Sequence, residues 1–348
     1  MGCSLNDCLS FSNGKKYPNS KGNIPIYGGN GVLGYCEESN ASNCIIIGRV
    51  GAYCGSVYYE KGKSWVSDNA IMGSAKEGFD IRFLYYLLLT LNLQKRQQGT
   101  SQPLLTQGLL KSINIPRLPE ISTQRRVSSF LSLFDQKIEL NNLVNDYLSE
   151  LIEAIFVEWF VGANSRYPTK KVLMDEIAFV NAGGDKPDVW QKCQTEEFPI
   201  PIFSNGIDNE GLYGYTTTAK ITKPSITVSA RGTIGFTCLR HEPYYPIVRL
   251  VSATPRDYVT AEYLYLWVKR ATVIGVGTTQ QQLTVPMFKN YEVDVPDATS
   301  MEEFTRVTTP LFKMVDANKA ENRKLSELRN ALLPKLISGE VDISKVVI

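Results

Sequence analysis

The stretch Leu5-Asn6-Asp7-Cys8-Leu9-Ser10-Phe11-Ser12-Asn13 returns in outline 168 positions later, as Leu173-Met174-Asp175-Glu176-Ile177-Ala178-Phe179-Val180-Asn181. Two further segments recur in the same order: Ile24-Pro25-Ile26-Tyr27 as Ile200-Pro201-Ile202-Phe203, and Gly99–Thr106 as Gly277–Thr284. The offset changes only in stretches that resemble loops. This pattern indicates a diverged tandem duplication, and therefore two similar units with approximate two-fold symmetry. Such a molecule suits a target with two half-sites, or two copies of one partner.

The composition is that of a chain with two globular domains. Its 348 residues, 43% of them apolar, are enough for two buried cores. Its seven cysteines include no C-x-x-C pair, which argues against a disulfide framework and a zinc ribbon, so we expect a reducing cytoplasm. His241 is the only histidine, which excludes most catalytic triads and histidine metal sites. The most apolar stretch, 83–93, is too short for a membrane span, and we expect no membrane residence.

The charge is small overall but unevenly distributed. The net charge is +2, yet residues 1–119 carry 12 basic and 7 acidic residues, a balance of +5, while residues 120–162 carry 3 and 7, a balance of −4. A nucleic-acid binder that acts alone usually has a larger basic excess. Either DNA is not the ligand, or partner proteins supply much of the charge that neutralises the phosphates.

Along the chain, the pattern predicts a mixed domain, a long helix, a second mixed domain and a second long helix. The boundaries are 1–119, 120–162, 163–299 and 300–338, followed by a short tail to residue 348. Short apolar runs predict strands on both sides of a glycine-rich turn in each half, and a dense apolar run predicts a buried helix in each. The predicted strands are 44–47, 55–59, 227–229 and 233–237, and the predicted helices are 83–88 and 263–268.

Both long helices show apolar residues at alternating spacings of four and three. In the first, the series is Val127, Leu131, Phe134, Ile138, Asn141, Asn145, Leu148, Ile152, Ile155 and Trp159. In the second, it is Phe304, Val307, Leu311, Met314, Asn318, Glu321, Leu325, Leu328 and Leu332. Such heptads predict a coiled coil, with polar residues near the middle of each seam that fix its register. Because the second domain lies between the helices, the simplest pairing is antiparallel. Gly339 is a suitable stop for the second helix.

The sequence contains no convincing catalytic motif. Gly28-Gly29-Asn30-Gly31 is better read as a turn than as a phosphate cradle, since the segment that follows does not resemble a helix. Asp135-Gln136-Lys137 is a degenerate match to a nuclease motif, but it lies within a predicted coil helix. The chain has no Pro-Pro, and so no methyltransferase signature of the Asn/Asp-Pro-Pro-Tyr/Phe type. We therefore predict a binding protein without catalytic residues, metal or cofactor.

Polar, glycine-rich turns are the candidate binding sites. An arginine occupies such a turn in each half, Arg49 and Arg231, and can fork onto a guanine edge or a phosphate. The alternative is a surface arginine, or one that is paired with an acid inside the protein. The polar clusters before each long helix could contact DNA or organise the junction with that helix. The candidate DNA-binding residues are Asn30, Arg49, Tyr53, Thr100 and Gln102 in the first half, and Asn205, Arg231, Thr233, Thr279 and Gln280 in the second.

The ordered, duplicated set of motifs resembles the specificity subunit of type I restriction-modification systems. Each half opens with a Leu-x-Asp-x-Leu/Ile-x-Phe-x-Asn segment and continues with Ile-Pro-Ile-aromatic and Asn-Gly (Asn30-Gly31 and Asn205-Gly206). An Arg-x-Gly or Arg-Gly turn, a Gly-Thr-x-Gln stretch and a long helix complete it. The resemblance covers essentially the whole chain.

This resemblance implies an α+β fold with two target-recognition domains and a function in reading DNA. Each domain would read one half of a bipartite, asymmetric sequence on double-stranded DNA, and the paired helices would set the unread gap. Two modification (methyltransferase) subunits would dock on the chain, and restriction motor-nuclease subunits could then join. Two alternatives stay open: a specificity subunit for a fused nuclease-methyltransferase, and a two-domain interaction scaffold that binds no nucleic acid.

Overall fold

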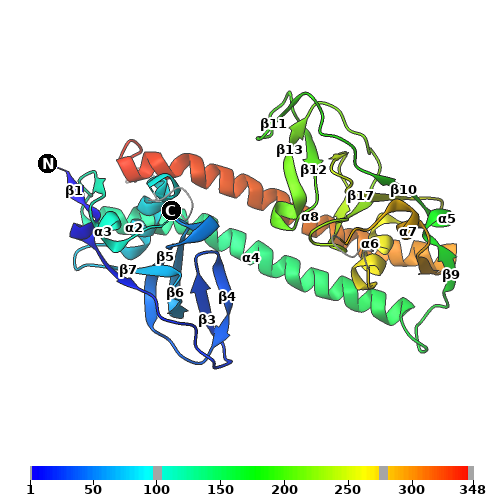
Figure 1. Ribbon diagram of the computed structural model, residues 1–348, viewed down its shortest axis with the longest axis horizontal. Helices are drawn as coiled ribbons and strands as arrows, with labels where there is room; N and C mark the ends of the chain where they lie inside the picture. The colour runs from blue at the N-terminus through cyan, green and yellow to red at the C-terminus, as the bar shows by residue number, and fades with distance from the viewer. Residues whose placement is uncertain (1, 97–103, 274–280, 344–348) are drawn as a thin grey trace. The chain divides into compact units, whose positions relative to one another are not determined.

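The computed structural model describes residues 2–96, 104–273 and 281–343. The chain divides into two compact units: unit 1 comprises Met1–Asn142 and Lys319–Ile348, and unit 2 comprises Leu143–Asn318. Each unit combines sheets and short helices with a part of each long helix, α4 (Ile121–Phe160) and α8 (Ala298–Ser338) (Figure 1). The predicted α+β architecture, with a duplicated mixed domain and two long helices, is confirmed.

Unit 1 is built on a six-stranded sheet of order β2-β7-β5-β6-β3-β4. Its centre is β5, whose residues Cys44, Ile45, Ile46 and Ile47 are all at most 1% exposed, as expected for a strand that is covered on both faces. The strands are β2 (Leu9–Asn13), β3 (Ile24–Gly28), β4 (Gly31–Cys36), β5 (Ala41–Gly48), β6 (Val57–Val66) and β7 (Ala70–Ala75). The remaining elements are β1 (Cys3–Ser4), which pairs with β8 (Asn114–Ile115), and α1 (Leu5–Cys8), η1 (Gly51–Tyr53), α2 (Ile81–Thr90), η2 (Leu93–Arg96) and α3 (Gln107–Lys111).

Unit 2 contains two four-stranded sheets, β10-β17-β14-β15 and β11-β13-β12-β16, and a two-stranded pair of β9 and β18. The strands are β9 (Lys170–Leu173), β10 (Ala178–Ala182), β11 (Trp190–Gln191), β12 (Ile200–Phe203), β13 (Leu212–Thr216), β14 (Ser225–Val228), β15 (Thr237–Arg240), β16 (Tyr245–Pro246), β17 (Val251–Pro255) and β18 (Glu292–Val295). The helices are α5 (Met174–Ile177), η3 (Asp208–Gly211), α6 (Ala261–Arg270) and α7 (Val285–Lys289).

The two units repeat one strand order. The series β2-β7-β5-β6 of unit 1 matches β10-β17-β14-β15 of unit 2, and the parallel pairing of β3 with β6 matches that of β12 with β16. In unit 1 the ten-residue strand β6 serves both pairings, whereas unit 2 divides the same path between β15 and β16. The duplication inferred from short sequence echoes is thus a duplication of topology.

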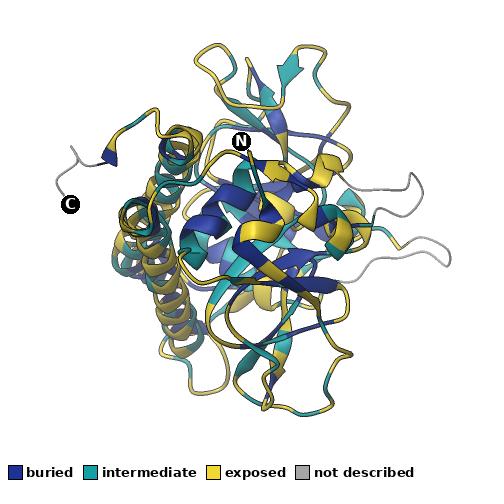
Figure 2. Ribbon diagram, turned by 90° about the vertical axis from the view of Figure 1, so that its left-hand side faces the viewer, coloured by how far each residue is buried: buried dark blue, intermediate teal, exposed yellow. Residues whose placement is uncertain are grey.

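Each unit buries its own apolar core around a helix that packs on the sheet. In unit 1, α2 contributes Phe83, Leu84 and Leu87, and the ends of the long helices add residues such as Leu131 and Leu333. In unit 2, aromatic rings from three helices meet with centroid separations of 5.2–6.1 Å; these are Phe156, Phe160, Tyr263 and Phe304. Each long helix packs against its unit with one buried face. Exposed residues recur along the rest of each helix (Figure 2).

The long helices pair in antiparallel fashion within each unit. In unit 1 the Asn141 amide donates to Glu321 Oε2 (2.7 Å) and to Asn322 Oδ1 (2.8 Å). In unit 2 the Asn318 amide donates to Asn145 Oδ1 (2.8 Å). Asn141 and Asn145 are at most 8% exposed, so the polar positions predicted for the first seam lie within the helix pair.

Two details of the sequence reading are wrong. Met314 and Leu328, predicted for the seam of α8, are 51% and 50% exposed, and Thr308 and Phe312 are buried instead. A helix with 3.6 residues per turn drifts away from a strict 3.5-residue repeat, which accounts for the shift. Residues 233–236 form a turn rather than a strand, because Gly232 and Gly235 adopt positive φ (69° and 86°). As predicted, α8 ends at Ser338, and Gly339 has φ 78°.

Within the residues that the structure describes, no helix has the length and apolarity needed to cross a membrane.

His241 links the break between β15 and β16 to two helices of unit 2. Its Nδ1 faces the carboxylate of Asp316 on α8, and its Nε2 lies 3.1 Å from Glu262 Oε1 on α6. The hydrogen bonds to Asp316 and then Glu262 raise the pKa of His241 to about 9, against the opposing effect of burial. Burial acts to raise the pKa of Glu262, but the bond from His241 holds it below its usual value. The imidazolium therefore fastens α8 to the domain at neutral pH.

This arrangement predicts a pH-dependent loss of stability. The folded pKa lies above the unfolded value of about 6.5, so the stabilisation is complete below that pH and is lost as pH rises through about 9. Chemical denaturation of the wild type and of His241→Gln should show a free-energy difference that shrinks between about pH 6.5 and pH 10. A difference that stays constant across this range would show that the imidazole contributes no charge-dependent stabilisation.

Candidate nucleic-acid interface

In unit 1 the candidate site is the turn that leaves the central strand β5. The backbone of Arg49 is held on both sides: its N–H donates to Asn69 O (2.9 Å), and its carbonyl accepts from Leu105 N–H (2.9 Å). Its side chain is partly buried, and its Nε atom is buried without a hydrogen-bond partner among the described residues. A buried N–H without a partner is unfavourable, so this Nε can donate a hydrogen bond to an acceptor that the described residues do not supply.

Close approach of three loops places the other candidates of unit 1 beside Arg49. A Cβ atom at Gly48 would collide with the carbonyl oxygen of Tyr53, and one at Gly29 would lie 3.5 Å from Gly48 Cα. Tyr53 is 50% exposed, and Asn30, which follows Gly29, is also exposed. The structure thus brings Asn30, Arg49 and Tyr53 together at one edge of the sheet.

In unit 2 the corresponding turn leaves β14. The Ala230 N–H donates to the side-chain oxygen of Asn205 (2.7 Å), and its carbonyl accepts from Leu283 N–H (3.0 Å). Ala230, like Arg49, is bonded through both its N–H and its carbonyl. Arg49 therefore corresponds to Ala230, and Arg231 lies one position further along the turn. Arg231 is exposed and donates from Nη2 to Gln282 Oε1 (2.9 Å). Both arginines lie on the turn, as predicted, but at positions that are not equivalent.

Asn205 and Thr233 differ in their surroundings. The Asn205 amide also donates to Val248 O (2.7 Å), so this side chain joins two neighbouring turns through both its oxygen and its nitrogen. The Oγ1 of Thr233 is buried and makes no hydrogen bond to any residue in the described ranges. Asn205 therefore shapes the edge, whereas Thr233 has capacity for a ligand. Thr100, Gln102, Thr279 and Gln280 lie outside the described residues.

The sequence reading missed the turn at Val248 and Arg249. Both residues are exposed and have positive φ (52° and 60°), which is rare for β-branched and long side chains. The turn is held by bonds from Val248 N–H to Gly184 O and from Arg249 N–H to Gly183 O, both 2.8 Å. Strain of this kind gathers at functional sites, and here it presents a second arginine on a turn that Asn205 joins to the turn of Arg231. The four residues of the turn, 247–250, include no glycine, asparagine or proline, so they carry no turn signal of their own.

Over residues 2–96, 104–273 and 281–343, no group of three or more His, Cys, Asp or Glu side chains could hold a metal ion. Exposed arginine, aromatic and amide groups on clamped loops can instead donate hydrogen bonds to phosphates and to base edges.

Comparison with known proteins identifies the family. The family model for the type I restriction modification DNA specificity domain matches twice, over residues 4–149 and 170–327, and so accounts for most of the chain. The chain belongs to this family. The two matches correspond to the two repeats seen in the topology.

Similar proteins agree with this assignment. A Mycoplasma pneumoniae protein with the name type I specificity subunit S.MpnORF507P is 27% identical over 308 residues, covering 84% of this chain and 83% of the relative. The HindI specificity subunit of Haemophilus influenzae is 22% identical over 355 residues, with coverages of 74% and 77%. The crystal structure of a type I S subunit from M. genitalium has the same fold, with a TM-score of 0.62 at 16% identity and coverages of 97% and 96%.

The specificity subunit determines the DNA sequence at which a type I system acts, and the methyltransferase and nuclease activities reside in other subunits. The expectation of a non-catalytic DNA-specificity protein is confirmed by this membership.

Asn30 and Asn205 occupy similar motifs in the two halves, but their replacement by alanine should change the free energy of unfolding by different amounts. Asn205→Ala removes partners from Ala230 N–H and Val248 O and should lower the free energy of unfolding by about 1–2 kcal/mol. Asn30→Ala, at an exposed turn, should change it by less than about 0.5 kcal/mol. Urea denaturation of both variants provides the measurement. Equal losses would mean that Asn205 does not hold the two turns together.

Proposed function

We propose that each unit of the specificity subunit reads one half of a bipartite, asymmetric DNA sequence. One observation carries the proposal. The two units share a strand order and a similar turn after the central strand, but the side chains on that turn differ. Where unit 1 has Arg49 and Val50, unit 2 has Ala230 and Arg231. Two edges with the same backbone support and different donors are suited to two different half-sites.

In this proposal, residues 1–119 and 163–299 are the two target-recognition domains. Residues 120–162 and 300–338 form the paired helices that set the length of the unread gap. The candidate contacts are Asn30, Arg49 and Tyr53 in unit 1 and Arg231 and Thr233 in unit 2, with Asn205 as the residue that orients its edge. Thr100, Gln102, Thr279 and Gln280 remain candidates from the sequence alone.

The proposed assembly places two modification subunits on the repeated halves of the chain, with restriction motor-nuclease subunits joining them on double-stranded DNA. The modest net charge of +2 supports partners that supply much of the phosphate-neutralising charge. A cytoplasmic location fits the cysteines, since all seven lie in the described residues as free thiols.

Exchange of one domain tests the division of labour. Residues 1–119 are replaced by the matching region of a relative with a different recognition sequence, and the methylated motif is mapped in the assembled complex. We expect one half of the motif to change and the other half and the gap to persist, because each edge is built within its own unit. A change in both halves would contradict the proposal, and methylation that needs no specificity subunit would support the scaffold alternative.

Arginine truncation tests the edges themselves. Arg49→Ala should reduce discrimination at one position of its half-site by about 1–3 kcal/mol, and Arg231→Ala should do so in the other half. Methylation rates on duplexes with single base-pair changes give this measurement. Arg323→Ala, at an exposed position of α8, is the matched control and should leave the motif unchanged. An equal loss on all duplexes would assign the arginine to a phosphate rather than to a base.

A further inference from the structure

The loop between β12 and β13 distinguishes unit 2 from unit 1. The residue pair Phe203 and Leu212 that closes it corresponds to Tyr27 and Val32 of unit 1. The unit 2 loop, 204–211, has eight residues where the unit 1 loop, 28–31, has four. Additional residues at an edge that already carries the candidate contacts can give unit 2 a contact that unit 1 lacks.

This longer loop is held in one conformation. Ser204 N–H donates to Gly211 O (2.8 Å) across its base, and Arg240 binds both the carbonyl and the carboxylate of Glu210. The Arg240 side chain is only 6% exposed and lies over the ring of Phe203, 3.6 Å from its centroid. Asn209 and Glu210 have φ of 47° and 55°, a strained pair that these bonds maintain. A rigid loop can place a side chain for recognition with little loss of entropy on binding.

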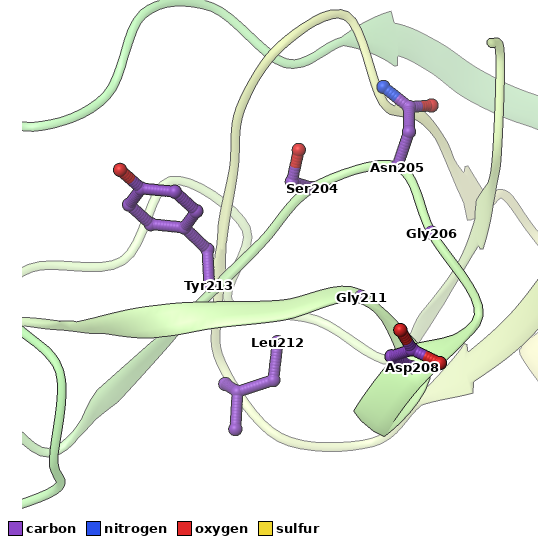
Figure 3. A pocket seen from close by; sticks show the side chains of 7 residues that line it. All are labelled: Ser204, Asn205, Gly206, Asp208, Gly211, Leu212 and Tyr213. Atoms are coloured by element: carbon purple, nitrogen blue, oxygen red, sulfur yellow. The ribbon is translucent and has the colours of Figure 1, made fainter. Parts of the chain in front are cut away.

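The tip of the loop presents one apolar and one acidic side chain. Ile207 is 56% exposed, and Asp208 beside it is exposed as well. Asp208 lines an open pocket of about 230 Å³ with Ser204, Leu212 and Tyr213 (Figure 3). Its carboxylate makes no hydrogen bond or ion pair to any of the residues that the structure describes. This carboxylate is available to a ligand.

The surroundings of Asp208 restrict what that ligand can be. Asn205, at the start of the same loop, bonds to the turns that carry Arg231 and Arg249, so the loop belongs to the candidate DNA edge. A carboxylate repels phosphates, which its arginine neighbours attract. At a base edge, a carboxylate accepts a hydrogen bond from an exocyclic amino group, either N4 of cytosine or N6 of adenine.

We infer that Asp208 is a specificity-determining residue of unit 2, which accepts a hydrogen bond from the amino group of one cytosine or adenine in the second half-site. Ile207 provides an apolar contact beside it. This inference rests on the proposed function and adds to it a named residue and a class of base. Unit 1 has only Gly28–Gly31 at this place, so the contact is confined to one half-site.

The test is to map the methylated motif of the assembled complex with Asp208→Asn. The amide keeps the size of the side chain but adds a donor, so preference at one position of the second half-site should fall about five- to a hundredfold. The other positions, including the whole first half-site, should not change. Asp257→Asn is the matched control: Asp257 is exposed in unit 2, beyond the opposite end of β17 from Arg249, and its φ of 53° suits asparagine.

The outcomes separate this inference from the function on which it rests. An unchanged motif with Asp208→Asn would overturn the role of Asp208, while domain exchange would still report whether each unit reads one half. If Asp208→Asn abolishes methylation, Asp208→Glu restores a carboxylate and should recover methylation of the same motif. Failure of both variants to assemble, with Asp257→Asn active, would make Asp208 a structural residue and contradict the inference.

Discussion

The candidate edges of both units depend on one backbone constraint, a residue whose N–H and carbonyl are both bonded to neighbouring loops. In unit 1 that residue is Arg49, held by Asn69 and Leu105, and in unit 2 it is Ala230, held by Asn205 and Leu283. The bonds fix the turn that leaves the central strand, and with it the direction of each following side chain. Because the constraint acts on the backbone, the side chains on the turn can differ between the units while the support stays the same. In the proposed function, this difference allows the two units to read two different half-sites.

The helix pair shows the same duplication in its polar contacts. Asn141 and Asn145 of α4 stand 177 positions before Asn318 and Asn322 of α8. Asn141 bonds to Asn322 within unit 1, and Asn145 bonds to Asn318 within unit 2. The shift of 177 positions that relates the two repeats therefore maps one bonded pair onto the other, as expected for a duplicated unit. Amides within the helix pair that bond to one another specify a register that apolar contacts alone would leave open.

Most of the fold followed from the sequence, because its signals are local and repeated. The heptads of α4 predicted a seam that is buried or half-buried throughout, and the apolar run 44–47 predicted the central strand. The one-position difference between Arg49 and Arg231 could also have been found. Gly51 and Gly232 both have positive φ (73° and 69°), and aligning them places Arg231 opposite Val50. The offset that grows from 176 at Phe203 to 180 at Leu212 marks the longer loop of unit 2.

Other features of the site have no local signal. The turn at Val248 and Arg249 is imposed by bonds to Gly183 and Gly184, which lie more than 60 positions away in the chain. Asn205 and Asn30 occupy similar motifs, but only the packing of the turns decides that Asn205 is engaged within the protein. The choice between a side chain that supports an edge and one that faces a ligand is made by tertiary contacts.

Two similar units with different edges are proposed to read two different half-sites. The most direct test is base-resolution mapping of methylation by the complex of this chain with its modification subunits, compared with the modification subunits alone. We expect one motif of two unlike half-sites with an unread gap, and no methylation when the chain is absent. A palindromic or uninterrupted motif, or methylation that persists without the chain, would contradict it.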